Sequence, residues 1–315
     1  PTLPADNPLT REGVELGRHL FFDPILSTDS TLACATCHRP ERGFTAPLQD
    51  LQAPDGSPLP RKPLPLVNLA FHPPGFFFDG RAPSLRDAIL QHLEDPLLMG
   101  TSRTLALQRL RNGAAYPALF RKAFPITHRN EIGEMEVGKA LEQFLLTLIS
   151  GTSKFDRAAY LKDGTTLSDL ELEGYFHFFR ESLVDHPGCS HCHTAPLLGG
   201  TEGFFNNGLD SALAPQDFPD PGRGAVTLLD EDFGEFKVPS LRNVGLRRSF
   251  MHDGRFASLE EVLEHYCCNW KPAPNLGPDI QGFSLTPEEK EALIAFLHAL
   301  TDTAFLQNPA FQSPF

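Results

Sequence analysis

The 315-residue chain is short of basic residues, of long apolar runs and of a recognisable targeting segment. Its 27 Lys and Arg are outnumbered by 40 Asp and Glu, and a net charge of -13 argues against nucleic acid, whose phosphates need basic surfaces. No run of about 18 apolar residues occurs, so the sequence predicts no membrane-spanning helix. The chain begins at Pro1 without a charged or apolar leader, and we therefore expect a mature product whose signal peptide is absent.

Tryptophan, methionine and tyrosine are also scarce, at one, three and four residues against 26 phenylalanines. Strand patterns are nearly absent, whereas helical periodicity recurs between Pro-rich and Gly-rich stretches. We expect a mostly α fold with long ordered loops and little sheet. The predicted helices cover residues 10–22, 84–93, 131–150, 168–183, 258–266 and 286 to about 300, capped at Thr10, Ser84 and Thr286; the predicted loops cover 34–83, 151–166 and 196–237.

Four of the six cysteines form two copies of one pattern, C-x-x-C-H. The residues are Cys34, Cys37 and His38 in the first copy, and Cys189, Cys192 and His193 in the second. This pattern is the attachment signature of c-type haem: two thiols bond the porphyrin vinyl groups and the adjacent His ligates the iron. A redox dithiol needs no following His, and a zinc site needs further ligands at similar spacing. The sequence therefore predicts two covalently attached haem c groups, with His38 and His193 as iron ligands.

The motifs lie inside a longer pattern that resembles the bacterial di-haem cytochrome c peroxidases and the MauG-like enzymes. The matching strings run in family order over roughly residues 7–300: Asn7-Pro8 to Phe22-Asp23-Pro24, Phe77-Phe78-Asp79-Gly80-Arg81, Pro96 to Met99-Gly100, Pro239 to Arg242-Asn243 and Met251-His252-Asp253-Gly254-Arg255. The resemblance implies two cytochrome c-like domains. We place the peroxidatic haem in residues 1–160 and a six-coordinate haem in residues 161–315.

The resemblance also implies an oxidoreductase that reacts with hydrogen peroxide and shares oxidising equivalents between two irons. We expect a MauG-like enzyme that forms high-valent iron and oxidises an aromatic residue, Trp or Tyr, of a partner protein by long-range electron transfer. One alternative is a peroxide-scavenging cytochrome c peroxidase that receives electrons from a small cytochrome or cupredoxin. A second alternative is a di-haem electron carrier. Because cytochrome c maturation takes place outside the cytoplasmic membrane, the expected compartment is the periplasm.

Tyr266 is the expected distal ligand of the second haem. The family's peroxidases carry a Met fourteen residues after the His of the H-D-G string, and MauG-like enzymes carry a Tyr; here that position, counted from His252, is Tyr266. A Tyr ligand stabilises oxidised iron, whereas Met raises the potential. A core aromatic residue is the alternative role for Tyr266.

Three residues within four positions after Tyr266 also have candidate roles. Cys267 and Cys268 form either a vicinal disulfide or a pair of free thiols, ahead of a metal role with His265. Trp270 is either a packing residue or an electron-hopping site.

The first haem is expected to be open, with His38 as its only protein ligand. No His lies between Arg39 and Phe71, where the family's peroxidases keep a distal His, although His72 is a possible replacement. By alignment, Ala88 and Leu98 replace the family's catalytic Gln and Glu. His92, four residues after Ala88, is therefore the candidate acid–base group, with Glu94 in reserve. A core or surface position, or direct ligation of the iron, are the alternative roles of His92.

Two further departures concern the region that the family places between its haems. Phe78 stands where the family has a Trp, and it should be a poorer hopping site. Lys62 stands at the position of an Asn that ligates calcium in the family, together with backbone oxygens around Arg247 and Ser249. Because Lys cannot ligate calcium, bound calcium is doubtful.

Overall fold

A computed structural model describes residues 3–180, 188–199 and 203–315, and the chain separates into two compact units. Unit 1 contains residues 1–74, 82–149 and 306–315, and unit 2 contains residues 75–81 and 150–305. The expected division into 1–160 and 161–315 differs from these units in its boundary and in the two exchanged segments, 75–81 and 306–315. Each haem motif lies in a different unit.

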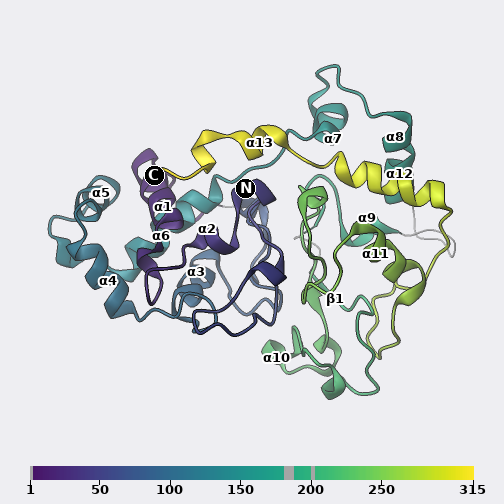
Figure 1. Cartoon of the computed structure of the whole chain (residues 1–315), viewed down its shortest axis with the longest axis horizontal. Coiled ribbons are helices and arrows are strands. Elements are labelled where there is room, and N and C mark those ends of the chain that lie inside the picture. Colours follow the sequence, from purple (N-terminus) through teal and green to yellow (C-terminus); the bar gives the residue numbers. More distant parts are fainter. Residues whose placement is uncertain (1–2, 181–187, 200–202) are drawn as a thin grey trace. The chain divides into compact units, whose positions relative to one another are not determined.

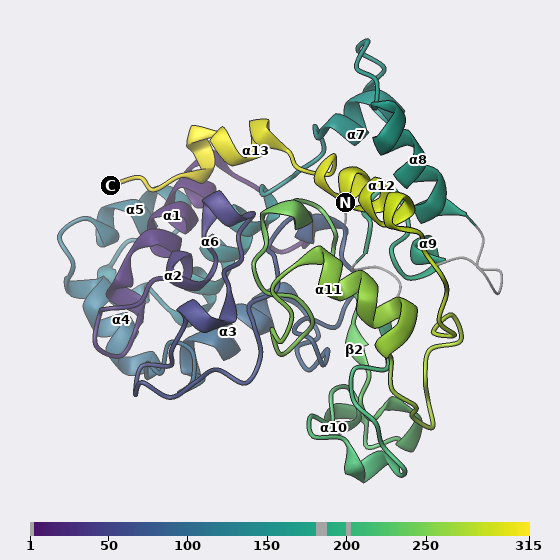
Figure 2. The same cartoon turned by 45° about the vertical axis from the view of Figure 1, so that its right-hand side comes forward.

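Unit 1 is helical. Its helices are α1 (Arg11–Phe22), α2 (Cys34–Cys37), α3 (Leu85–Glu94), α4 (Arg103–Asn112), α5 (Tyr116–Ala123) and α6 (Glu134–Leu146). Helices α1 and α6 cross closely, as both views show (Figures 1 and 2). The crossing depends on Gly17, because a Cβ there would lie 1.9 Å from the carbonyl oxygen of Ala140. The C-terminal segment closes this unit, since Arg18 donates to the carbonyls of Pro309 and Gln312 at 2.7 Å.

Unit 2 repeats this construction with different helices. Its elements are α7 (Lys154–Asp156), α8 (Asp169–Phe179), α9 (Cys189–Cys192), β1 (Phe204–Phe205), α10 (Gly224–Thr227), β2 (Phe236–Lys237), α11 (Leu259–Glu264), α12 (Pro287–His298) and α13 (Thr303–Gln307), which leads into unit 1. Helices α8 and α12 lie side by side in both views (Figures 1 and 2). Here a Cβ on Gly174 would lie 1.9 Å from the Ala292 carbonyl oxygen. In both units, a glycine thus allows two helices to pack closely.

Phenylalanine fills the core of unit 2. Phe155, Phe178 and Phe296 are almost completely buried. The ring centroid of Phe296 in α12 lies 5.4 Å from that of Phe155 in α7 and 5.3 Å from that of Phe178 in α8. Tilted and edge-to-face aromatic packing of this kind supplies apolar area without a polar atom to satisfy. The scarcity of Trp and Tyr is therefore consistent with a core that needs no buried indole or phenol.

The mostly α prediction is confirmed, and β1 and β2 are the only strands among the described residues. The caps at Thr10, Ser84 and Thr286 form as predicted. The helix expected over 131–150 is shorter, Glu134–Leu146, and that over 168–183 ends at Phe179, with residues 181–183 outside the described part. The expected helix 258–266 changes at His265 into one π-helical turn, His265–Asn269.

Several helices and short turns were not predicted. Helices α4 and α5 are short and bury only two residues each, Ala106 and Leu110 in α4 and Tyr116 and Phe120 in α5, which gives too short a pattern for periodicity to mark them. The expected linker 151–166 contains α7 and a π-helical turn, Arg157–Leu161. The expected loop 196–237 contains β1, α10 and β2. Among the described residues, no helix is long and apolar enough to cross a membrane.

Candidate functional site

The first motif forms the short helix α2 and the turn after it. Cys34 and Cys37 are not joined in a disulfide, and burial raises the pKa of both thiols, that of Cys34 to about 12. The His38 ring is buried and its Nδ1 lies 3.1 Å from the Phe44 carbonyl oxygen. Phe44 adopts a left-handed conformation, φ 59°, which directs the chain back over the motif.

His38 is prepared as a neutral ligand. Burial, with a further contribution from nearby His92, lowers the pKa of His38 to about 4. The Nδ1–H donates to the Phe44 carbonyl, and the lone pair therefore resides on Nε2. A ligating His typically has this arrangement, because the second-shell bond fixes the ring and its tautomer.

The second motif has the same local form in α9. Burial raises the pKa of the Cys189 thiol to about 12, and Cys189 and Cys192 are not paired in a disulfide. Gly199, at φ 117°, passes beside the proximal residue of this motif: a Cβ there would lie 3.0 Å from His193 Nδ1 and 2.3 Å from the Pro239 carbonyl oxygen. A side chain at this position would displace the ring, so the glycine is required sterically.

The donor set in each unit fits a c-type haem. Each motif supplies two half-buried cysteines that are not oxidised to a disulfide, one short helical turn and one imidazole that follows it directly. This combination matches the requirements for thioether attachment and axial ligation.

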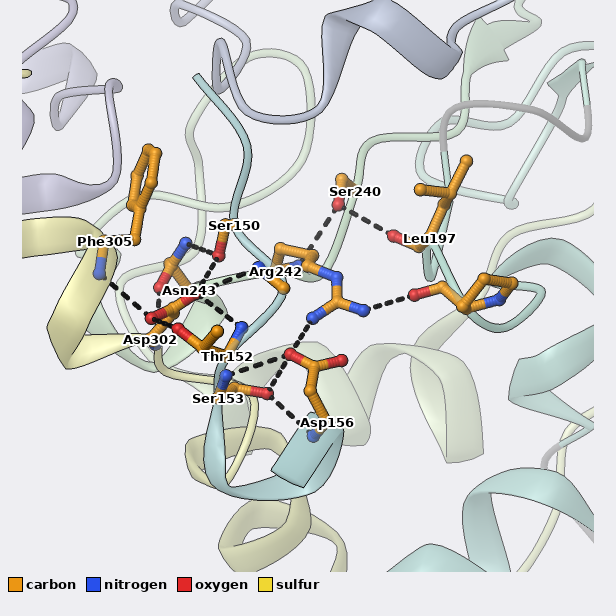
Figure 3. Close-up of polar contacts among 12 residues, drawn as sticks. Ser150, Thr152, Ser153, Asp156, Leu197, Ser240, Arg242, Asn243, Asp302 and Phe305 are labelled. Atoms are coloured by element: carbon orange, nitrogen blue, oxygen red, sulfur yellow. Dashed lines mark hydrogen bonds and ion pairs between the residues drawn. The ribbon is translucent and has the colours of Figure 1, made fainter. Parts of the chain in front are cut away.

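An ion-pair network holds the loop that follows the second motif (Figure 3). Arg242 pairs with Asp156, and both side chains are only 3% exposed. The other guanidinium nitrogen of Arg242 donates to the Pro196 carbonyl, and Ser240 donates to the Leu197 carbonyl at 3.1 Å. Pro196 and Leu197 come just after His193, so this network positions the proximal side of the second site.

Asp302 anchors a second part of the same network. Its carboxylate accepts hydrogen bonds from Ser150, from the backbone of residues 151 and 152, and from Phe305 (Figure 3). These donors lower the pKa of Asp302 against the opposing effect of burial. Asn243 connects the two parts, because its amide donates to Ser150 and its carbonyl accepts from the Asp302 backbone.

Tyr266 lies in the π-helical turn at the end of α11. Its hydroxyl is 3.3 Å from Nδ2 of Asn207, which donates to it, and burial raises the Tyr266 pKa to about 12. The Cys192 and Cys189 thiols also raise this pKa, so the hydroxyl is close enough to the second motif to interact with its sulfurs electrostatically. The phenol therefore lies near the second motif. π-helical turns occur frequently at functional sites.

Asn207 organises this region, and sequence reasoning missed it. Its backbone carbonyl accepts from His265 Nε2 at 3.0 Å, while its amide nitrogen lies 3.3 Å from both the Tyr266 hydroxyl and the Met251 sulfur. Met251, which precedes the His of the H-D-G string, thus shares the Asn207 amide with Tyr266. The Asn207-Gly208 turn was the only local signal available.

The residues after Tyr266 resolve one open question. Cys267 and Cys268 form a disulfide. Glu264 is near both sulfurs, but its carboxylate pairs with Lys290 at 2.6 Å, and a disulfide offers no thiolate for a metal. Trp270 is half-buried and packs on two glycines, since a Cβ on Gly208 or Gly282 would lie 3.0–3.1 Å from it.

Helix α3 brings His92 to the first motif. Its ring centroid lies 6.2 Å from that of His38, and its Nδ1 is 2.9 Å from the Ala88 carbonyl oxygen. Leu98, at the family's Glu position, packs with Cys37 in an apolar cluster. Glu94 instead is exposed and pairs with Arg103, which lowers the Glu94 pKa. The reserve acid role predicted for Glu94 therefore has no support in this geometry.

Phe78 belongs to residues 75–81, the short segment that is part of unit 2 although the residues on both sides of it belong to unit 1. It is buried, its carbonyl accepts from the Lys237 backbone at 2.7 Å, and its ring lies edge-to-face with His252 at 6.4 Å. His252 in turn stacks on Phe236, with centroids 3.6 Å apart. Phe78 is thus fixed within an aromatic group that includes the His of the H-D-G string.

The residues considered for calcium are all buried, and two of them, Lys62 and Arg247, are basic. Lys62 is 5% exposed in unit 1. In unit 2, burial lowers the pKa of Arg247 to about 10, and its guanidinium donates to the carbonyls of Ser240 and Arg242. Ser249 is buried, and its hydroxyl donates to Gly254. His72, the other ligand candidate of unit 1, is half-buried after a 3-10 turn.

Comparison with known proteins gives consistent matches. The family model for di-haem cytochrome c peroxidase matches residues 11–164. The methylamine utilization protein MauG of Methylorubrum extorquens is 36% identical over 299 residues, which cover 94% of this chain and 80% of that protein. Cytochrome c551 peroxidase of Pseudomonas aeruginosa is 30% identical, covering 93% and 80%. A crystal structure of a MauG-like protein associated with microbial copper homeostasis superposes with a TM-score of 0.87 at 30% identity, covering 100% of this chain and 96% of that one.

Proposed function

The chain belongs to the di-haem cytochrome c peroxidase family, and from that membership we propose that it acts in the periplasm as a MauG-like enzyme. In this proposal it uses hydrogen peroxide to oxidise a Trp or Tyr side chain of a partner protein by long-range electron transfer. Peroxide accepts two electrons and two protons and yields two waters. The partner's aromatic side chain loses the two electrons and two protons.

The two C-x-x-C-H motifs would hold the haem groups, with His38 and His193 on the irons. Haem, when bound there, would supply the redox chemistry between peroxide and the partner's side chain. The protein fixes the His38 imidazole through its contact with the Phe44 carbonyl, and Cys37 and Leu98 both pack against a small apolar cluster. Apolar packing beside the motif limits the water next to it.

The observation that carries the proposal is the position of Tyr266. Its hydroxyl is buried beside the second motif and held by Asn207. Without a metal, burial keeps this phenol protonated; a ferric iron reverses that preference, as bound cations do for their ligands. A phenolate stabilises oxidised iron and so favours storage of oxidising equivalents over rapid transfer of electrons. Storage is what oxidation of a remote side chain requires.

Other residues take supporting parts in this proposal. His92, close to His38, is the group that takes the proton from peroxide and returns it to the leaving oxygen. Phe78 and Trp270 are the two aromatic residues considered as electron-hopping sites. Phe78 contacts His252, while the packing of Trp270 on Gly208 and Gly282 is as expected of a structural residue.

A second candidate function is peroxide scavenging with a small cytochrome or cupredoxin as electron donor. One observation favours it: the Met251 sulfur lies 3.3 Å from the same Asn207 nitrogen that contacts Tyr266. A thioether on the second iron would raise its potential and suit it to receive electrons.

The test determines which molecule is oxidised when peroxide is reduced: a side chain of a partner protein or a small electron donor. Holoprotein and peroxide are incubated with each exported protein encoded beside the gene, and the intact mass of each candidate is measured. Loss of two hydrogen atoms, mapped to a Trp or Tyr and absent without peroxide, is the expected result. Turnover of peroxide with a reduced small cytochrome c, and no mass change in any candidate, would assign the scavenging function instead.

A further inference from the structure

One pattern occurs twice in the chain, over residues 68–94 and 243–266, and the D-G-R turn of the first copy packs with unit 2. An Asn in the left-handed conformation starts each copy: Asn68 at φ 60° and Asn243 at φ 59°, each followed by a single 3-10 turn. A D-G-R turn follows in both, closed by an ion pair within the turn: Asp79 with Arg81 at 3.0 Å and Asp253 with Arg255 at 2.6 Å. The next element in each copy is a helix.

The two helices start in the same register. Ser84 caps α3 and Ser258 caps α11, and each accepts a hydrogen bond from the backbone three residues later. The first and fifth helical residues are buried in both: Leu85 and Ile89 at 8% exposure in α3, and Leu259 and Leu263 at 7% and 5% in α11. The same face of each helix therefore packs on the core of its unit.

By sequence position His92, in α3, is the counterpart of Tyr266, in the π-helical turn that continues α11. His92 comes eight residues after Ser84, and Tyr266 comes eight residues after Ser258. Tyr266 is the expected distal ligand of the second iron, so its counterpart lies where a distal ligand of the first iron would lie. The chemistry at the position also fits, because imidazole is a common iron ligand.

The orientation of the His92 ring supports ligation. Its Nδ1 is 2.9 Å from the Ala88 carbonyl oxygen, so Nδ1 carries the proton and Nε2 is the ligand atom. His38 has the same arrangement through the Phe44 carbonyl. Both imidazoles are thus fixed by a backbone acceptor in the tautomer that binds a metal through Nε2.

The spacing of the two rings distinguishes direct ligation from a proton shuttle across bound peroxide. A metal–nitrogen bond of about 2 Å plus roughly 1 Å from nitrogen to ring centre gives about 3 Å on each side, or about 6 Å between two imidazoles on one metal. The observed separation is 6.2 Å. An oxygen between the iron and His92 would add roughly 3 Å of hydrogen-bond length, which this separation does not accommodate.

We propose that His92 binds the iron of the first haem through Nε2 in the resting protein, opposite His38. The first iron is then six-coordinate at rest, in place of the open site that the sequence led us to expect. Peroxide must displace His92 before it can bind, and the released imidazole remains on α3 near the iron, where it can accept the peroxide proton. The proposal needs haem at the first motif but does not depend on partner oxidation.

The test is low-temperature EPR of the ferric holoprotein, with two haems per chain confirmed by mass and without peroxide or partner. The expected wild-type spectrum contains two low-spin haems. His92→Ala should convert one of them to high spin, and added imidazole should restore it. His72→Ala, which removes the other histidine considered as a ligand in unit 1, is the matched control and should leave the spectrum unchanged.

Two results would overturn the proposal: a stoichiometric high-spin haem in the wild type, or conversion by His72→Ala instead of His92→Ala. If His92→Ala loses the first haem, the near-infrared spectrum of His92→Met tests ligation at this position instead. A new thioether charge-transfer band in the near infrared supports ligation at this position, and a spectrum identical to wild type contradicts it. Failure of partner oxidation would leave these spectra unaffected, so the two proposals fail separately.

Discussion

Removal of the Asp156 carboxylate should destabilise unit 2 strongly. In Asp156→Ala the Arg242 guanidinium remains buried, at 3% exposure, with one carbonyl acceptor at Pro196 and no counter-charge. Breaking a buried ion pair in this way costs about 3–5 kcal/mol. The variant also loses the two hydrogen bonds that Asp156 accepts from Ser153, which cap α7; a lost cap costs about 1 kcal/mol. We expect a loss in the free energy of unfolding of about 4–6 kcal/mol, and a smaller loss for Asp156→Asn.

The assay is urea unfolding of the holoprotein, followed by circular dichroism and by the absorbance of the haems. Asp163→Ala is the matched control: Asp163 pairs with Arg157 a few residues away, but these side chains are 38% and 50% exposed, so no measurable change is expected. Because the Arg242 network holds the loop after His193, the low-spin signal of the second haem should broaden in Asp156→Ala only.

The double variant Asp156→Ala with Arg242→Met provides a further check, since it removes the orphan charge and should recover part of the lost stability. If Asp156→Ala costs no more than Asp163→Ala, the pair contributes nothing beyond a surface contact and the reasoning is refuted.

Three other predictions follow from the sites. Tyr266→Met should introduce a near-infrared thioether band and abolish peroxide-dependent modification of the partner; a variant with the wild-type spectrum would show that Tyr266 is not the ligand. Glu235→Gln should raise the melting temperature at about pH 8 but not at about pH 5: burial and nearby carboxylates raise the Glu235 pKa from 4.5 to about 7, so its stabilising contribution is complete below 4.5 and is lost as pH rises through 7. Equal shifts at both pH values would contradict this. Phe78→Trp should speed the decay of the peroxide-oxidised holoprotein in stopped-flow absorbance, because indole is oxidised more easily than benzene; an unchanged rate would remove Phe78 from the electron path.

Covalent chemistry and capping rules made much of the molecule predictable. The C-x-x-C-H spacing predicts both attachment sites, and Thr10, Ser84 and Thr286 start their helices because a side-chain oxygen there satisfies a free backbone N–H. The boundary at His265 could not be predicted, because propensity does not distinguish an α-helix from one π-helical turn.

Contacts between distant residues were also beyond the sequence. Glu94 was assigned to a pocket by its place on α3, but Arg103 attracts it to the surface. Asn207 joins Tyr266, Met251 and His265 through loop geometry that no local pattern records. The equal eight-residue spacing from Ser84 to His92 and from Ser258 to Tyr266 was present in the sequence, yet it acquires meaning only when both helices are seen to bury the same positions.

The exchange of segments between the units constrains the order of synthesis and assembly. Arg18 is in the first helix of unit 1, but its carbonyl partners, Pro309 and Gln312, come 291 and 294 residues later. Unit 2 likewise takes residues 75–81 from within the unit 1 sequence. A nascent chain therefore cannot complete its first unit before its second has been translated. A single protease cut near residue 150 should leave two fragments that stay associated, and removal of the last ten residues should weaken the N-terminal unit first.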